Sequence, residues 1–579
     1  MINKTEMGSG KCNFIILFFF LFSLSFGVSA KNIQYKIQGI NGDLKNNVVY
    51  YLDSLSAIPI SKAPLRESKI KQAVRQGMQA LGYYSPKITF SYPKADDDQL
   101  VIQIDKGDPV HVRNFYIELN GDAKKDPDFQ KILATPDLKE KSVFNHAKYE
   151  NLKSRIKTLA VSNGYFDARM TESSVKIYPS EKAADVVIDF ESGHRYKFGE
   201  IHVEGIPDTS VIDPLLHFKT GEAYSTRQLA QLSQSLSQTK YFQTVNVHPD
   251  TENIQNYTVP VLVKLTHRKD NIMETGVGYS TDEGPRLQWN WEKPWVNDKG
   301  HHFTSQLKIA QTTQSADFSY YVPNKNPIDD YYKFQTTLEE EDLDDTQYKE
   351  VETGVHYITK LWGDWQRDYF LKTQYEEYTQ GEDEGNTLLY LPGVSLTRVR
   401  SRGGMDPDWG DTQTMTVMFS DPAWMSDTRF VSVWGRSKWL RTYAEKHRLI
   451  FRAEQGALLW GNLDEIPASE RFFTGGDQTI RGYSYQSISP KDSSGKLSGA
   501  LNTSVVSLEY NYQFAPKWRI ATFVDAGTAT NDYQDAWKVG TGIGTRWLSP
   551  VGPLKIDLAF GVSERPIPFR IHFALGPDL

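Results

Sequence analysis

The chain has 579 residues, of which 13% are aromatic and 24% charged, and its formal net charge is −7. This acidic balance argues against nucleic acid as the main partner. Its single cysteine, Cys12, excludes a disulfide framework within the chain. Many aromatic residues combined with a mean hydropathy of −0.51 are typical of a β-barrel with aromatic girdles and a wet interior.

Residues 1–30 have the pattern of a secretory signal peptide. Lys4 and Lys11 precede the apolar run Phe14–Phe26, and residues 28–30 (Val-Ser-Ala) offer small side chains for cleavage. The run is shorter than the roughly 20 residues that a membrane-spanning helix needs. We therefore expect export, with the mature chain beginning at residue 31.

Three units of mixed α/β pattern follow, and we assign them to residues 31–108, 109–193 and 194–268. Each reads as strand, helix, helix, strand, strand, and in the third unit the helices are expected near Val211–Phe218 and at Ser225–Gln238. An echo closes the second helix of each unit, and its three copies are Gly82-Tyr83-Tyr84, Gly164-Tyr165-Phe166 and Lys240-Tyr241-Phe242. A repeat of about 80 residues indicates tandem domains. The third copy lacks the glycine, so we expect a different helix exit there.

Residues 269–579 alternate in polarity with a period of two, as strands do. Leu554, Ile556, Leu558 and Phe560, for example, alternate with polar or small residues. At about 20 residues per strand and connection, this stretch predicts an even number of strands near 16. The predicted fold is three α+β domains followed by an all-β antiparallel transmembrane barrel, because a membrane protein without a spanning helix needs a closed barrel.

One connection, residues 461–499, is too long for a hairpin, and loops of this length usually carry function. Its middle contains Gly475 and Gly476 and then Ile480-Arg481-Gly482-Tyr483. Gly540, Gly542 and Gly544 share the inward face of a later strand, where the loop tip is expected to pack. Glu509 and Asp525 are predicted to be lumen carboxylates.

The β-α-α-β-β unit with its Gly-Tyr-aromatic turn resembles the POTRA domain, and Ile480–Tyr483 resembles the motif at the tip of the inward loop in the BamA and TamA superfamily. Three such units before a barrel are similar to the TamA branch. The resemblance implies a bacterial outer-membrane protein with POTRA domains in the periplasm. It also implies that Arg481 faces Asp525, with Glu509 as second candidate.

By the same resemblance, the protein would insert or secrete autotransporter-type β-barrel clients. Its implied partners are unfolded outer-membrane proteins, outer-membrane lipid and a TamB-like protein that is anchored in the inner membrane and spans the periplasm. An unfolded client strand could add to the open sheet edge of a POTRA domain through main-chain hydrogen bonds.

The junction between the first and last strands is predicted to be the weakest in the barrel. Gly276 and Gly278 give the first strand no side chain to pack, and Pro577 cannot donate to a ladder just after the short last strand. The last strand presents Phe569, Ile571 and Phe573 on one face. We expect this seam to open toward lipid, and a disulfide between a residue near Gly276 and one near Phe573 to lock it.

Two other functions remain open at this stage. A two-partner secretion pore shares the barrel but usually has two POTRA domains and a plug helix, and a passive porin would need neither the three repeats nor the long loop. No metalloprotease or hydrolase motif is present. The sequence therefore predicts no catalytic residue, metal site or cofactor.

Overall fold

The computed structural model describes residues 33–58, 62–92, 99–206, 208–550 and 552–575, which form two compact units divided between Tyr196 and Lys197. The predicted signal peptide and the C-terminal residues 576–579 lie outside this described part. Among the described residues, no helix is both long enough and apolar enough to cross a membrane.

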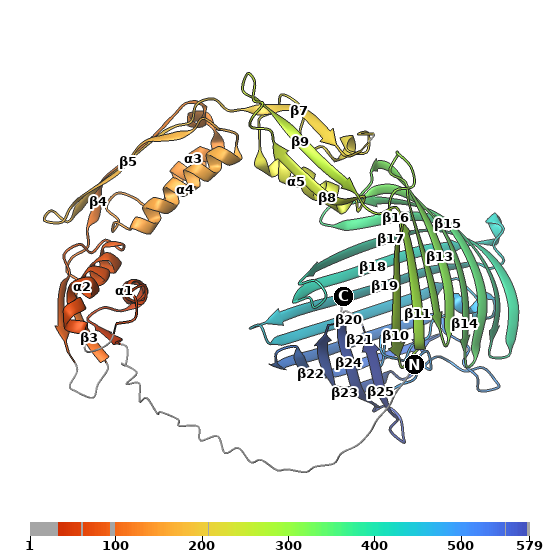
Figure 1. Ribbon diagram of the computed structural model, residues 1–579. Helices are drawn as coiled ribbons and strands as arrows, with labels where there is room; N and C mark the ends of the chain where they lie inside the picture. Colours follow the sequence, from red (N-terminus) through yellow and green to blue (C-terminus); the bar gives the residue numbers. More distant parts are fainter. Residues whose placement is uncertain (1–32, 59–61, 93–98, 207, 551, 576–579) are drawn as a thin grey trace, which may run out of the picture. The chain divides into compact units, whose positions relative to one another are not determined.

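The first unit begins with a three-stranded sheet in the order β1-β3-β2, in which β3 pairs parallel to β1 and antiparallel to β2. Two helices pack against it (Figure 1). The elements are β1 (Gln34–Gln38), α1 (Gly42–Asp53), α2 (Ala63–Gln79), β2 (Lys87–Ser91) and β3 (Gln99–Asp105). Alternate residues of β3 are buried against Ile70 and Met78 of α2. Each such apolar side chain contributes about 1.5–3 kcal/mol.

The second domain repeats this design with the sheet order β4-β6-β5. Its elements are β4 (His111–Asn120), η2 (Asp122–Lys125), α3 (Pro127–Ala134), α4 (His146–Ser162), β5 (Arg169–Tyr178) and β6 (Ala183–Glu191). Asp126 caps α3 by accepting a hydrogen bond from the Asp128 N–H at 2.9 Å, and it also accepts one from the Tyr165 hydroxyl at 3.0 Å. Burial and this carboxylate raise the pKa of Tyr165.

The third domain has the sheet order β7-β9-β8 and belongs to the second unit. Its elements are β7 (Lys197–Glu204), η3 (Asp213–Leu215), α5 (Thr226–Gln238), β8 (Phe242–Pro249) and β9 (Thr258–His267). The first of its two predicted helices was wrong, because only a single 3-10 turn forms near residues 211–218. Pro214 lies inside that turn and cannot donate the hydrogen bond that a longer helix would require.

The first two echoes form the same helix exit, in which the Tyr83 N–H donates to the Met78 carbonyl at 3.0 Å and the Tyr165 N–H donates to the Ala160 carbonyl at 2.9 Å. Gly82 and Gly164 have φ values of +94° and +80°, and Lys240 adopts the same left-handed conformation with φ of +62°. In the third domain the Tyr241 N–H instead donates to the Thr239 hydroxyl at 3.3 Å, so the different exit expected there is confirmed. The Tyr241 hydroxyl donates to the carbonyl of Gly300 at 2.6 Å, so this side chain joins the third domain to a turn of the barrel.

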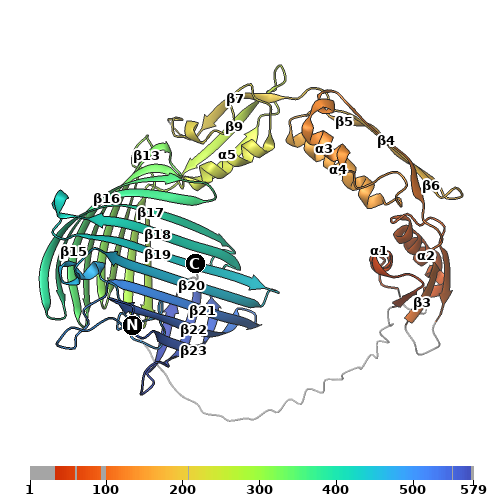
Figure 2. The same ribbon diagram turned by 180° about the vertical axis from the view of Figure 1, so that it is seen from behind.

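Strands β10 to β25 form one antiparallel sheet of 16 strands in sequence order, as predicted (Figures 1 and 2). Their bounds are β10 (Ile272–Ser280), β11 (Gly284–Lys293), β12 (His302–Ala310), β13 (Thr313–Asn326), β14 (Asp330–Leu343), β15 (Thr346–Lys360), β16 (Trp365–Gln380), β17 (Asp383–Arg402), β18 (Trp409–Ser420), β19 (Phe430–Tyr443), β20 (His447–Leu459), β21 (Asn502–Ala515), β22 (Trp518–Thr530), β23 (Lys538–Ser549), β24 (Gly552–Gly561) and β25 (Phe569–Leu575). The outer face is apolar: Leu508, Val524, Ile543 and Ile556 are each at least half exposed there. Such a band suits contact with lipid.

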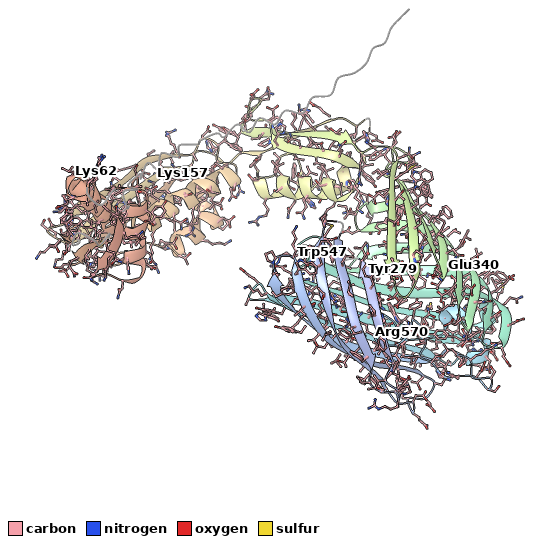
Figure 3. All side chains as sticks on the ribbon, turned by 60° about the horizontal axis from the view of Figure 1, so that its bottom comes forward. Lys62, Lys157, Tyr279, Glu340, Trp547 and Arg570 are labelled. Atoms are coloured by element: carbon pink, nitrogen blue, oxygen red, sulfur yellow. The ribbon has the colours of Figure 1, made fainter. Side chains whose placement is uncertain are left out.

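The sheet curls round until β10 and β25 lie beside each other, but among the described residues no ladder joins them. Two hydrogen bonds of 3.3 Å link Thr281 and Phe573, and the rings of Tyr279 and Phe573 lie 5.9 Å apart. Tyr279 and Arg570 mark the two edge strands in Figure 3. The contacts place Phe573 beside Thr281 rather than near Gly276, so the pair of positions expected to lock the seam was wrong.

Candidate functional site

The long connection between β20 and β21, the eleventh and twelfth barrel strands, folds into the barrel instead of standing outside it. It contains two short turns, η5 (Leu463–Glu465) and η6 (Ala468–Glu470). Ile480 at its tip is fully buried, and Arg481 and Tyr483 are only 3% and 5% exposed. The tip therefore lies in the lumen.

Arg481 is the centre of the site. Its Nε and Nη2 atoms donate to the two oxygens of Asp525 at 2.7 and 2.9 Å, which is a bidentate pair. Its Nη1 atom donates to Glu509 at 2.6 Å and to Asp557 at 3.2 Å. Its guanidinium also lies 3.4 Å from the centre of the Phe523 ring, within cation–π range. The structure brings Arg481 together with both predicted partners, Asp525 and Glu509.

A second arginine completes the charge balance. Arg546 of β23 donates to Glu509 at 2.9 Å and to Asp557 at 2.6 Å. Two arginines thus share three carboxylates, and Arg452 lies 3.8 Å from Asp525. A buried charge is costly unless it is paired and hydrogen-bonded, and here every member has at least one charged partner.

The glycine trough of β23 is only partly filled by the loop. A Cβ atom on Gly540 would lie 1.9 Å from the carbonyl oxygen of Arg481, so this glycine allows the loop backbone to approach. Gly542 instead leaves room for Phe523, and Gly544 for Asp557 and Arg546. Of the three glycines at which the loop tip was expected to pack, Gly540 is therefore the one that lies against the loop.

Three of the loop glycines with positive φ values, Gly475, Gly476 and Gly482, lie in close contact with other parts of the chain. A Cβ on Gly475 would meet the Ser484 carbonyl at 2.3 Å, and one on Gly476 would meet Asp282 at 2.6 Å. Gly482, with φ of +95°, lies against Phe560 of β24. Tyr483 packs beside Gly561. These contacts make the tip a tight fold that only glycine permits at those positions.

The base of the loop is held on the opposite wall. Ser469 donates its backbone N–H to Glu376 of β16 at 3.2 Å, and Arg471 pairs with Asp383 of β17 at 2.9 Å. A cavity of about 560 Å³ remains in the lumen beside the loop. The loop therefore spans the barrel interior from β16 and β17 to β21–β25.

The structure also shows partners that the sequence reasoning did not assign. Asp557, Arg546 and Phe523 surround Arg481, and strand parity alone would have placed them on the inward face. His572 of β25 accepts a hydrogen bond from the Gly482 N–H at 3.0 Å, although only Phe569, Ile571 and Phe573 were singled out on that strand. Their neighbour His572 is 3% exposed and faces the lumen.

The seam glycines differ from each other. A Cβ on Gly276 would meet nothing within 4 Å, whereas one on Gly278 would come within 2.8 Å of the Arg286 side chain. Phe569 and Ile571 are 66% and 59% exposed on the outer face of β25. Gly276 therefore leaves open space, and Gly278 makes room for a neighbouring side chain.

Comparison with protein families gives three kinds of match. The Omp85 superfamily domain matches residues 269–578, which is more than half of the chain. The POTRA domain described as TamA domain 1 matches residues 34–106. The repeat described as surface antigen variable number repeat, a POTRA model, matches residues 111–193 and 196–268.

Similar proteins agree with this. Two relatives are named outer membrane protein assembly factor BamA: that of Nitratidesulfovibrio vulgaris is 25% identical over 69% of this chain, and that of Neisseria meningitidis 21% identical over 86%. The match spans 53% of the first relative and 70% of the second. The crystal structure of BamA from Haemophilus ducreyi lacking POTRA domains 1–3 aligns with a TM-score of 0.67 at 16% identity, covering 81% of this chain and 99% of that one. The chain therefore belongs to the Omp85 superfamily, with its barrel in the outer membrane and its POTRA domains in the periplasm.

Proposed function

We propose that this protein is an outer-membrane assembly factor whose barrel opens sideways between β10 and β25 to insert or secrete client β-barrel proteins. The observation that carries the proposal is the seam, where two hydrogen bonds stand in place of a ladder among the described residues. The neighbouring pair β24–β25 has a register of seven residue pairs. Opening the barrel between β10 and β25 therefore breaks fewer hydrogen bonds than opening it between β24 and β25.

An open seam would present two strand edges with unpaired N–H and C=O groups. In lipid each unsatisfied group costs several kcal/mol, so the edges favour pairing with another strand. A client hairpin can supply that pairing with little demand on its sequence. Insertion then proceeds by exchange of main-chain hydrogen bonds and needs no catalytic residue.

The Arg481 cluster supports this function by keeping one wall of the barrel rigid. Asp525, Glu509 and Asp557 belong to three strands, β22, β21 and β24, and Arg481 binds all of them. When the seam opens, this wall would stay folded as one body. The client edge on β25 would then stay in place.

The periplasmic domains would gather the clients. Each POTRA sheet has two edge strands, for example β1 and β2 in the first domain, that can accept a client strand. The match of the first domain to a TamA-type POTRA model supports autotransporter-type clients and a TamB-like partner. The names of the BamA relatives support the broader role in outer-membrane protein assembly.

A disulfide across the seam tests the proposal. Thr281→Cys with Phe573→Cys places thiols at the contact between the two edges. Thr336→Cys with Thr353→Cys is the matched control, since these residues face each other in the paired strands β14 and β15. Cys12 is the chain's only cysteine, so no native thiol competes once residues 1–30 are absent.

Oxidation of the seam pair is expected to abolish client insertion into vesicles, and reduction to restore it, while the control pair leaves insertion unchanged. Full insertion by protein whose seam disulfide is verified on a gel would refute lateral opening. That outcome would favour export through the lumen, as in a two-partner secretion pore, and immobilising the loop would then block export.

A further inference from the structure

The loop crosses the lumen and also contacts both sides of the seam. On the β25 side, the Gly482 N–H donates to His572 at 3.0 Å and Arg570 donates to the Ser484 hydroxyl. On the β10 side, the Asp477 N–H donates to Asp282 at 2.7 Å. Asp282 lies in the turn between β10 and β11, directly after the first strand.

The two attachments are unequal. The loop tip is tied to β21, β22, β24 and β25 through Arg481 and Gly482. On the β10–β11 hairpin, within the described part of the chain, the loop is held at one residue, Asp282, which interacts with the backbone N–H and the side chain of Asp477. If the seam opens, the weaker attachment yields first, so the hairpin leaves and the loop stays with β25.

Asp282 also faces β25 directly. Because the Gly482 N–H donates to Nε2 of His572, the neutral ring carries its proton on Nδ1. That Nδ1 atom is buried, has no hydrogen-bond partner among the described residues, and lies 3.9 Å from Asp282 Oδ1. The side chains of His572 and Asp282 are only 3% and 8% exposed. A movement of about 1 Å would close this gap to a hydrogen bond.

We propose that Asp282 is a latch, the positioning residue through which the loop holds the β10–β11 hairpin against β25 and keeps the seam closed. Gly476 is needed beside it, because a Cβ there would lie 2.6 Å from the Asp282 carboxylate. This inference rests on the lateral opening proposed above and adds what controls it.

The charges around Asp282 make the latch sensitive to pH. Asp477 faces it from the loop, and Arg570 and His572 face it from β25. Burial and the Asp477 carboxylate raise the pKa of Asp282 to about 7. An Asp282 exposed by opening would return to about 3.9.

The sign follows from linkage. The closed seam binds the proton more tightly, so its stabilisation is complete below about pH 3.9 and declines as the pH rises to about 7. Above about pH 7, Asp282 is deprotonated in both the closed and the open state, so its contribution to the equilibrium between them no longer changes with pH. The ratio of open to closed seams should therefore rise roughly 10- to 100-fold between pH 5 and pH 8.

Spin labels on Val277→Cys and Ile571→Cys test this in the full mature chain, in vesicles of phosphatidylethanolamine and phosphatidylglycerol. Both side chains point outward, at 78% and 59% exposure. The expected result is one short distance at pH 5 and a growing longer population toward pH 8. Asp282→Asn, which resembles the protonated carboxyl, should keep the short distance at both pH values, and Asp282→Ala should show the long one at both.

Glu283→Gln is the matched control, because Glu283 lies in the same turn but pairs with Lys308 and Arg286 instead of the loop. It should keep the wild-type pH response. The latch is overturned if wild-type distances do not change with pH, if Asp282→Ala matches the wild type, or if Glu283→Gln loses the response equally. The seam disulfide distinguishes this proposal from lateral opening itself. If the oxidised seam variant is inactive but the Asp282 variants behave as the wild type, lateral opening is retained and only the latch is refuted.

Discussion

Arg481 has more interaction partners than an arginine in a solvent-exposed loop usually has. It donates to three carboxylates on three strands and stacks on Phe523. Each carboxylate would be left with less compensation if the guanidinium were removed. The cluster is therefore a joint between the loop and the barrel wall, and its value lies in fixing the loop position.

Removing Arg481 should weaken that joint strongly. We expect Arg481→Ala to lower the free energy of unfolding by roughly 3–5 kcal/mol, since it leaves buried carboxylates uncompensated. Arg436→Ala, which breaks a half-exposed pair with Glu454, should cost at most about 1 kcal/mol. Urea unfolding in detergent, followed by the change in gel mobility, measures both.

A double-mutant cycle with Asp525→Asn isolates the pair. Because Arg481 and Asp525 share two side-chain hydrogen bonds, their effects should be strongly non-additive. Additive losses from the two single variants would show that the pair is not coupled, in spite of its geometry.

The sequence predicted the residues of this pair but not their whole environment. The motif resemblance pointed to Asp525 and Glu509 because a lumen arginine needs a carboxylate partner. Asp557 and Arg546 lie at inward-facing positions of their strands. The alternation of side chains along a strand predicts which residues face inward, but not which inward-facing residues contact each other. That information depends on strand register, which places Gly544 directly opposite Asp557.

At the scale of elements, the contact between β23 and the loop decides where the tip can lie. Gly540 is opposite Asp525 in the ladder, and its missing side chain leaves space for the Arg481 carbonyl. The loop and β23 are therefore in contact where the backbone of Arg481 lies against Gly540. A side chain at this position would compete with the loop for the same volume.

Gly540→Ala should displace the loop tip. Its Cβ would lie 1.9 Å from the Arg481 carbonyl, and overpacking of this kind costs roughly 1–3 kcal/mol. Gly435→Ala on β19 is the control, because the nearest atom there is the Thr414 carbonyl at 3.5 Å. Limited proteolysis of the loop is expected to be faster in the first variant and unchanged in the second. Equal cleavage of both would mean that Gly540 does not position the tip.

Most elements could be predicted from periodicity, and the misses have physical causes. The 16 strands follow from alternation over a long stretch, and the helices α2 and α4 from long apolar repeats. The turn at Asp213–Leu215 was overestimated as a helix because its apolar residues suit one, while Pro214 and its short length do not. At Lys240 the missing glycine correctly indicated a different exit. The lysine still adopts the left-handed conformation, but the Thr239 hydroxyl replaces a backbone carbonyl as the acceptor of the Tyr241 N–H.

On the scale of the whole molecule, the protein combines a nearly closed barrel, a loop that crosses its lumen and three domains with open sheet edges. The loop makes one wall rigid, and the seam is the place where the sheet is least paired. The sequence could indicate a weak seam from Gly276, Gly278 and the short last strand. It could not give the register across the seam, because in the described part of the chain no ladder joins β10 to β25.

The central claim is that clients enter through the seam, and contact between a client and the seam edge tests it most directly. Two variants are compared: one carries a cysteine at Gly276 on β10, and the other carries one at Thr336 on the fully paired strand β14. Each is oxidised in the presence of a client that is stalled during insertion and has a cysteine at a single position of its last strand, which is varied. The account predicts a disulfide between position 276 and the one client residue that lies opposite it in the paired strands, and few or none at position 336. Equal crosslinking at the two positions, or efficient insertion without any crosslink at position 276, would contradict it.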